Sequence, residues 1–460
     1  MAYDDGVDTI ITCDNGISAI DQIQYAKDLG LTVIVTDHHD VPFIEEDGVR
    51  TFLSSQADAI INPKQIECEY KFKSICGAGV AFKLMEALYE EIGMDKEECY
   101  KLIEFVAIAT VCDVVDLIDE NRIFVKNGLE MLNNSKNIGI NALKKACGLE
   151  DKEITAYHLG FVIGPCLNAS GRLDSAKKGL ELLLMEDDEE AEKLAQEIVD
   201  LNDARKNMTK EGVDRAINII DSTDINNDKI LVVYIPDIHE SLAGIVAGRV
   251  KEKYNKPTII LTKSEEGVKG SARSIEEYNM FEGLLACKEL LDKFGGHPMA
   301  AGLSLQEDKV DELRKALNNK CELTDEDLTR KIMIDSSLPL EYLNLHLIEE
   351  LNVLEPFGKG NSKPVFGVRD AKITKAILLG KDKNVLKLKL LTNNNITIDA
   401  MIFNDLENFE SKIIEKYGNE ELDNLYNKSN NNIPMDFTFY PSINEWNGNK
   451  SIQIVVNGIR

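Results

Sequence analysis

The sequence predicts an α/β protein built from three structured parts. In the first hundred residues, short β-branched runs alternate with segments of helical spacing. Residues 186–222 form a long polar stretch whose apolar residues recur every three or four positions, and strictly alternating segments begin beyond residue 330. We therefore expect a parallel-sheet domain, a smaller α/β domain joined to it by a long helix, and a C-terminal antiparallel β-barrel.

The expected parallel sheet follows from a βαβ pattern near the start of the chain. Strands are predicted at 9–12, 31–35 and 58–61, with a helix over 17–29 between the first two. Asp14-Asn15-Gly16 follows the first strand, and Asp37-His38-His39 follows the second. Because open parallel sheets bind ligands at the carboxyl ends of their strands, these side chains mark the edge where a site is expected.

The rest of the chain supplies the other two parts. Helices are predicted at 79–92 and 100–116, and a second α/β unit at 230–234, 241–254 and 257–261. Gly164–Leu173 is interpreted as a Gly-rich loop, and Gly295–Gly302 as a His between glycines at the start of a helix. The expected domain boundaries are 1–185, 186–222 for the linking helix, 223–325 and 326–460.

Charge and cysteine content narrow the functional classes. The net charge of −28 argues against nucleic acid when it is taken alone. Residues 244–274 nevertheless carry seven basic residues against three acidic ones, a strip that could hold a strand or simply be a solvated surface. The nine cysteines are scattered and form no CxxC pair, which favours reduced thiols in a cytoplasmic protein. No stretch is long and apolar enough to span a bilayer, so we expect no membrane partner.

The cluster Asp37-His38-His39 is the first candidate site. With Asp14 from the neighbouring strand it offers carboxylates and imidazoles together, a mixture that suits a divalent ion such as manganese. Paired surface histidines without a ligand are the alternative. Asp113 lies in the apolar run Phe105–Val115, where a carboxylate is costly unless it is paired or bound to metal. A helix cap or a buried hydrogen bond would explain Asp113 equally well.

Three further segments contain residues suited to phosphate. Gly164–Leu173 contains Asn168 and Arg172. Ser271–Ser274 contains Arg273, and the Gly-Gly-His block Gly295–Gly302 contains His297. Arginine forks match phosphate oxygens, and glycines let the backbone approach closely. Each segment alone is weak evidence, since most Gly-rich turns are only turns.

In order along the chain, these segments together resemble the RecJ branch of the DHH phosphoesterases. The likeness extends over Ile11–Ser18, Val35–His39, Cys76–Phe82, Ala109–Val115, Glu355–Asn361 and Asn444–Gly448 as well as the three segments above. It implies a DHH domain, a DHH-associated nucleic-acid-binding domain and an OB-fold. It also implies an exonuclease that removes nucleotides from the 5′ end of single-stranded DNA in repair and recombination. Helicase and single-strand-binding protein partners are implied in the same way.

The same resemblance assigns roles to individual residues. Asp14, His38 and Asp113 would bind Mn²⁺ or Mg²⁺, and Asp37 would orient an imidazole. The phosphate and its neighbours would be held by His39, Asn168, Arg172, Arg273 and His297. Trp446 would stack on a base, although packing within the barrel is at least as good an interpretation.

One departure from the family leads to a further expectation. RecJ-type proteins carry an upstream Asp-x-Asp motif that supplies carboxylate ligands to both of the family's two metal ions, and only thirteen residues precede Asp14 here. Asp4-Asp5-Gly6 is a poor substitute. We therefore expect an N-terminally truncated chain with one incomplete metal site and impaired activity. The alternatives are another DHH phosphodiesterase, acting on oligoribonucleotides or cyclic dinucleotides, and an inactive DNA-binding remnant or half of a split enzyme.

Overall fold

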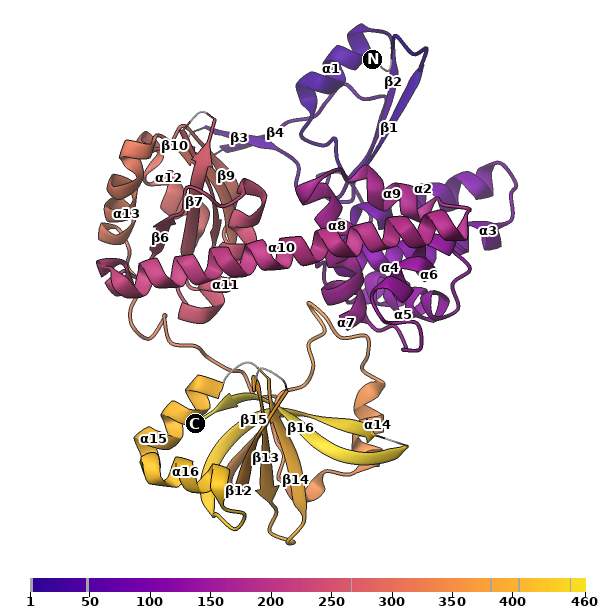
Figure 1. Cartoon of the computed structure of the whole chain (residues 1–460). Coiled ribbons are helices and arrows are strands. Elements are labelled where there is room, and N and C mark those ends of the chain that lie inside the picture. The colour runs from indigo at the N-terminus through magenta and orange to yellow at the C-terminus, as the bar shows by residue number, and fades with distance from the viewer. Residues whose placement is uncertain (1–2, 47–48, 266, 381–382, 404–405, 447) are drawn as a thin grey trace. The chain divides into compact units, whose positions relative to one another are not determined.

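The computed structural model describes residues 3–46, 49–265, 267–380, 383–403, 406–446 and 448–460 (Figure 1). The chain divides into two compact units. Unit 1 consists of residues 1–129 and 331–460, and unit 2 of residues 130–330. Within the described residues, no helix combines the length and apolar character needed to cross a bilayer.

Unit 1 begins with the predicted parallel sheet, which is confirmed. Strands β1 (Thr9–Cys13), β2 (Thr32–Thr36) and β5 (Ala59–Ile61) pair in parallel in the order β1-β2-β5. Helix α1 (Ile20–Asp28) connects the first two, and its Ile23 packs with Val33 and Val35. The hairpin of β3 (Phe43–Glu46) and β4 (Val49–Phe52) follows β2. All three parallel strands therefore end at the same edge of the sheet.

A helical layer follows the sheet in the chain. It contains α2 (Gly77–Glu91), α3 (Lys96–Tyr100), α4 (Ile103–Cys112) and α5 (Asp119–Asn133). Phe82, Val106 and Phe124 share one buried cluster within it. The helix that we predicted to reach residue 116 ends at Cys112, because Val114 adopts a left-handed backbone conformation with φ of 56°.

The C-terminal part of unit 1 is a closed barrel. Its strands are β11 (Ser336–Ser337), β12 (Phe366–Leu379), β13 (Val385–Leu391), β14 (Thr397–Ile402), β15 (Ile433–Trp446) and β16 (Asn449–Ile459). The order β12-β13-β14-β16-β15 closes through pairing of β15 with β12, which leaves no open edge among these five. Most pairs are antiparallel, as predicted, while β14–β16 and β11–β12 are parallel. Phe409, Phe437 and Phe439 fill the core. The helices of this part are α14 (Leu345–Asn352), α15 (Leu406–Tyr417) and α16 (Asn419–Asn427), with the short 3₁₀ turn η6 (Leu340–Tyr342).

Unit 2 is organised along one long helix. Short helices come first: α6 (Ile138–Ala146), α7 (Ala156–His158), the π-helical turn η1 (Leu159–Ile163), α8 (Gly164–Leu173) and α9 (Lys177–Leu183). Helix α10 (Asp188–Ser222) confirms the predicted helix over 186–222. One half of α10 packs against α6, α8 and α9, and the other half packs against α11 and β6 (Figure 1).

The second α/β unit is a five-stranded mixed sheet. Its strands are β6 (Leu231–Tyr234), β7 (Thr258–Ser264), β8 (Gly267–Arg273), β9 (Lys293–His297) and β10 (Ala300–Leu305), in the order β6-β7-β8-β10-β9. One face packs against α10 and α11 (Ala243–Tyr254), and the other packs against α12 (Met280–Leu285) and α13 (Val310–Asn319). Short 3₁₀ turns are η2 (Asp224–Asn227), η3 (Glu240–Leu242), η4 (Lys288–Leu290) and η5 (Glu307–Lys309).

Two other predictions about local structure were also wrong. Gly164–Leu173 forms helix α8 rather than a loop, because Pro165 sits in its first turn, where no amide donor is needed, and Cys166 and Ala169 are buried. Gly295–Gly302 belongs to the β9–β10 hairpin rather than to a helix start. Gly296 has φ of 151° and lies against Ala300 and Ala301, so its backbone approaches the neighbouring strand closely.

Candidate metal centre

Asp14 follows β1 directly and begins the candidate site. Its backbone is left-handed, with φ of 62°, and its amide donates to the Thr36 carbonyl at 3.0 Å. Non-glycine residues rarely adopt this conformation, which costs about 1–3 kcal/mol and is concentrated at functional sites. Gly77, the first residue of α2, lies so close that an added Cβ would be 2.3 Å from Asp14 Oδ1. The positive end of that helix therefore lies beside the carboxylate.

Asp37 is buried and accepts hydrogen bonds at both carboxylate oxygens. Oδ2 accepts from the Ile17 amide at 2.9 Å, while Oδ1 accepts from the amides of His38 and His39 at 2.7 and 3.1 Å. Oδ1 also lies 2.7 Å from His39 Nδ1. Burial raises the pKa of Asp37, but these hydrogen bonds outweigh it and hold the pKa below its usual value. Asp37 therefore shapes the loop after β2 rather than facing a ligand.

His38 Nε2 is the central atom of the site. It lies 3.0 Å from Asp14 Oδ1 and 3.4 Å from Asp113 Oδ2, and it is buried without a hydrogen bond of acceptable geometry to any described residue. A buried polar nitrogen without such a partner is costly. Two carboxylate oxygens therefore lie within 3.4 Å of one imidazole nitrogen, a donor set that matches the ligand preference of a divalent cation such as Mn²⁺.

Asp113 reaches this point from the end of α4. It caps the helix immediately before left-handed Val114. Burial raises the pKa of Asp113, the charge of His38 opposes this, and the charge of Asp14 adds to it. A carboxyl group in this setting is poorly compensated by the protein alone, and a bound cation would stabilise its charged form.

His39 lies at the open side of the cluster. Ligand atoms of Asp14, His38 and His39 lie within 4.8 Å of one another, and the two imidazole rings are 4.6 Å apart. The His39 side chain is 58% exposed, with Nδ1 engaged by Asp37. The structure thus brings together the five predicted residues Asp14, Asp37, His38, His39 and Asp113.

Four predicted phosphate ligands lie in unit 2. Arg172 Nη1 donates to the Ser241 carbonyl at 3.0 Å, and Arg273 Nη2 lies 2.8 Å from the position of a Cβ at Gly244. Burial, and then the charge of Arg172, lower the pKa of Arg273, so these two arginines are close enough to repel each other. Asn168 is exposed on α8. The Trp446 side chain lies outside the described residues.

Strand pairing places His297 in line with Arg273. Ala300 on β10 pairs with Arg273 on one side and with His297 on the other. Directly paired residues of antiparallel strands point to the same face, so the two side chains flank Ala300 across roughly 10 Å. Arg273 and His297 therefore occupy neighbouring positions on one face of the sheet, and Arg172 lies near Arg273.

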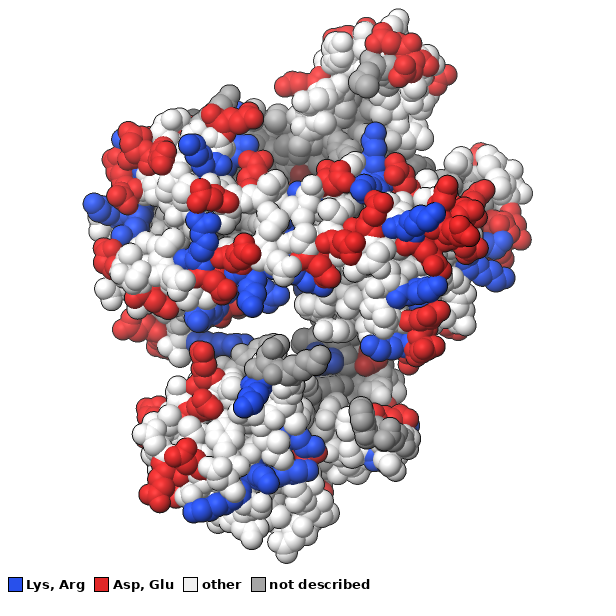
Figure 2. Space-filling model, viewed as in Figure 1, with Lys and Arg blue, Asp and Glu red and all other residues white. Residues whose placement is uncertain are grey.

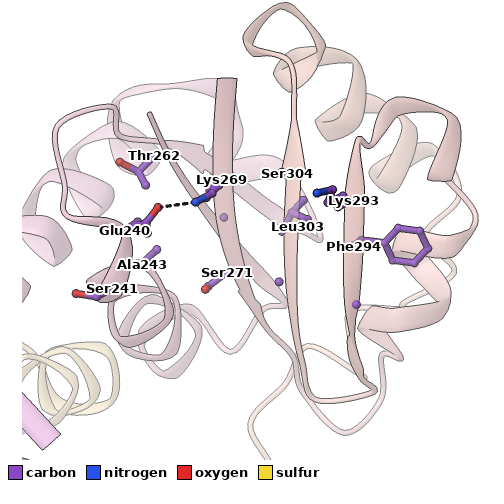
Figure 3. Close-up of a pocket in the computed structure, with 13 residues that line it drawn as sticks. Glu240, Ser241, Ala243, Thr262, Lys269, Ser271, Lys293, Phe294, Leu303 and Ser304 are labelled. Carbon is purple, nitrogen blue, oxygen red and sulfur yellow. Dashed lines mark hydrogen bonds and ion pairs between the residues drawn. The ribbon is translucent and has the colours of Figure 1, made fainter. Parts of the chain in front are cut away.

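A cavity of about 510 Å³ opens on this face of the sheet (Figure 3). Thirteen residues line it: Glu240, Ser241, Ala243, Thr262, Lys269, Gly270, Ser271, Lys293, Phe294, Gly295, Gly302, Leu303 and Ser304. The sequence indicated Lys269 as part of the basic strip at 244–274, but it did not indicate that Lys293 lies beside the same cavity. Their shared position depends on strand register, which the sequence does not reveal.

Gly77 was also missed. It lies in the quoted segment Cys76–Phe82 but received no role. A glycine that opens a helix at a predicted ligand edge is the signal that could have identified it.

Comparison with known proteins identifies the family. Residues 3–110 match the DHH family N-terminal domain, 227–323 the DHHA1 domain and 334–458 the RecJ OB domain. The single-stranded-DNA-specific exonuclease RecJ of Haemophilus influenzae is 33% identical over 478 residues, covering 100% of this chain and 78% of that protein. The chain belongs to the RecJ family. The RecJ of Bacillus subtilis is 36% identical over 455 residues, but the chain spans only 54% of its length.

Solved RecJ structures share the fold. The crystal structure of Thermus thermophilus RecJ in complex with Mn²⁺ matches with a TM-score of 0.78 at 26% identity, covering 98% of this chain and 62% of that one. A crystal structure of exonuclease RecJ bound to manganese matches with a TM-score of 0.56 at 29% identity, covering 69% of this chain and 77% of that one. The predicted architecture of a DHH domain, a DHHA1 domain and an OB barrel is confirmed.

Proposed function

We propose that the chain hydrolyses phosphodiester bonds of single-stranded DNA from the 5′ end, in a reaction that depends on Mn²⁺ or Mg²⁺. The convergence of Asp14 and Asp113 on the buried, unsatisfied Nε2 of His38 carries this proposal. Membership in the RecJ family supplies the substrate and the polarity. The likeness to RecJ structures that contain Mn²⁺ or Mg²⁺ supports the choice of ion.

Each residue of the centre has a distinct task in this proposal. Asp14, His38 and Asp113 would hold the ion, which when bound would lower the pKa of a water molecule and offset charge on the phosphate. Asp37 fixes the loop amides and the His39 ring. Because Nδ1 of His39 donates to the Asp37 carboxylate, Nε2 is the ring nitrogen left to contact a phosphate oxygen, and it donates to that oxygen when the ring carries both protons.

The strand would also be held by unit 2. Arg172, Arg273 and His297 offer donors suited to phosphate, and Asn168 and Trp446 stay proposed contacts on the family resemblance. Although the net charge is −28, acidic and basic side chains lie side by side over the visible face (Figure 2). A local cationic track is compatible with such a surface because salt screens charges more than about 10 Å apart.

Hydrolysis of labelled DNA tests the proposal. Purified chain with Mn²⁺ should release mononucleotides from 5′-labelled single-stranded DNA, and His38→Ala should abolish the release. Ile123→Ala, an exposed residue of α5, is the matched control. Hydrolysis confined to a dinucleotide would indicate a different DHH phosphodiesterase, and DNA binding without hydrolysis at any Mn²⁺ concentration would indicate a remnant or half of a split enzyme.

Location and partners form a separate proposal. We infer a cytoplasmic protein that works with a helicase or a single-strand-binding protein, on the basis of the family resemblance and of nine cysteines that form no disulfide bond among the described residues. Co-purification from lysate treated with nuclease would test the partners without bridging DNA.

A further inference from the structure

The floor of the cavity is formed by paired residues of β8, β10 and β9 (Figure 3). Three consecutive cross-strand rows point to that face: Arg273–Ala300–His297, then Ser271–Gly302–Gly295, then Lys269–Ser304–Lys293. The intervening positions Val268, Ala272 and Leu303 are buried in the core on the opposite side. The alternation of strands thus places every polar member of the three rows on one surface.

The middle of this surface is hollow and its two ends are cationic. A Cβ at Gly295 would meet no atom within 4 Å, and one at Gly302 would meet only the Gly270 carbonyl oxygen at 4.0 Å. Arg273 and His297 flank one end, and Lys269 and Lys293 flank the other. Helix α11 packs mainly on β7 and β8 of the same face, with Gly244 close to Arg273 and Ser271, so the open part of the face lies over β10 and β9.

The spacing of the rows suits an extended polyanion. Adjacent rows are separated by two residues, roughly 7 Å, so the two cationic ends lie roughly 14 Å apart. A single strand that follows a charged groove presents one phosphate per nucleotide. We therefore expect one nucleotide of an extended strand to bridge one row spacing. The middle row offers the Ser271 hydroxyl and open space above glycine.

Among the described residues, Glu240 is the one acidic side chain that lines the cavity, and it forms an ion pair with Lys269 at 3.1 Å. Both side chains are more than half exposed, so this pair contributes little and a phosphate can compete for the lysine. Lys293 is exposed, and among the described residues no acidic side chain forms an ion pair with it.

We propose that Lys269 and Lys293 form an additional phosphate subsite, two nucleotides along a bound single strand from the phosphate held at Arg273 and His297. This subsite rests on the proposed function and adds to it a direction for the strand across the sheet. Ser304, which lies between the two lysines in the same row, adds a hydroxyl donor. The cavity therefore binds the sugar–phosphate backbone, with its bases free to point outward.

Binding of short oligonucleotides without hydrolysis tests the subsite. Fluorescence anisotropy in EDTA would compare 3′-fluorescein thymidylates of two and four nucleotides, each with a 5′-phosphate. Lys269→Ala/Lys293→Ala should weaken binding of the tetranucleotide about fivefold, the size expected for exposed ion pairs, and leave the dinucleotide unchanged. The slope of log affinity against log salt should become shallower by about 0.7 for the tetranucleotide, as expected for one lost phosphate contact.

Two further variants test the subsite while both lysines stay in place. Glu240→Gln should tighten tetranucleotide binding, because it frees Lys269 and removes a negative charge. Gly295→Val should weaken tetranucleotide binding by filling the floor, in a position where its Cβ meets no clash. Lys315→Ala is the matched control, because Lys315 is exposed on α13 at the opposite face of the same sheet.

The outcomes separate the subsite from the proposed function. An unchanged salt slope in the double variant, or equal weakening for both oligonucleotides, would overturn the subsite while leaving DNA binding intact. Failure of the unmodified chain to bind the tetranucleotide at low salt would overturn the proposed function itself.

Discussion

Gly77→Ala should damage the metal centre without touching any predicted ligand. Gly77 opens α2 against Asp14, and an added Cβ would lie 2.3, 2.5 and 2.6 Å from Asp14 Oδ1, Cβ and Cγ. Ordinary van der Waals contact begins near 3.4 Å. Since 3.4 Å less 2.3 Å leaves 1.1 Å, one of the two groups has to move by about that distance.

The carboxylate is the group expected to move. Helix α2 is anchored by Val80 and Phe82, which are 3% and 5% exposed in a packed cluster, whereas the Asp14 side chain is 53% exposed. Metal–oxygen distances tolerate only about 0.2 Å of change, so a displacement of this size removes Asp14 as a ligand. We expect Mn²⁺ affinity to fall about 100-fold, or about 2.7 kcal/mol.

Isothermal titration of the purified variants with Mn²⁺ measures this effect directly. Asp14→Asn provides the comparison for loss of the ligand, and Gly248→Ala, where the added Cβ meets no atom within 4 Å, provides the matched glycine control. Thermal unfolding monitored by circular dichroism shows whether Gly77→Ala remains folded. Unchanged Mn²⁺ affinity in folded Gly77→Ala would refute the close packing of α2 on Asp14 and with it the assembly of the site described above.

Three other predictions concern the groups around the site and the barrel. Asp37→Asn should lower the free energy of unfolding by about 1–3 kcal/mol in urea titrations, because the buried Ile17 amide loses its acceptor; the exposed change Asp21→Asn should have no such effect. Burial raises the pKa of Asp399, but bonds from Lys387 and Lys389 outweigh it and lower that pKa, so the stabilisation is present above pH about 3.9 and lost as pH falls through the folded pKa. The difference in unfolding free energy between the unmodified chain and Asp399→Asn should therefore shrink from pH 7 to pH 3, and a constant difference would contradict the ion pairs. Arg122 Nη2 donates to the carbonyls of residues 353, 354 and 355 at 3.2, 3.2 and 2.8 Å, so Arg122→Ala should speed amide hydrogen exchange in that segment, with Arg122→Lys retaining part of the protection.

The edge of the parallel sheet where a ligand is expected could be predicted, because the residues that indicate it directly follow their strands in the sequence. Asp14 and His38 each follow a short β-branched run, and parallel strands bring such ends together whatever the rest of the fold does. Asp113 stood out because a carboxylate in an apolar helix requires a partner. These three residues meet in the structure as expected, while their roles and the domain boundaries stay predictions.

The remaining features depend on packing between distant segments. Gly164–Leu173 looked like a loop by composition, yet burial of Cys166 and Ala169 favours a helix there. The β9–β10 hairpin places Lys293 beside Ser304, and only the cross-strand register makes that visible. Composition and periodicity indicate the secondary structure that a segment prefers in isolation. The contacts described here depend instead on the segments that pack against it in the folded chain.

Helix α10 has a consequence for the evolution of unit 2. Its buried residues fall into two sets, Ala191 to Asn202 towards α6 and α8, and Thr209 to Ile220 towards α11 and β6. The 35-residue helix is about 52 Å long, and each residue turns it by about 100°. A single insertion between the two sets would rotate one anchoring stripe out of phase with the other and separate Arg172 from Ser241. Natural variants of this chain should therefore change length in loops, while the middle of α10 keeps its residue count.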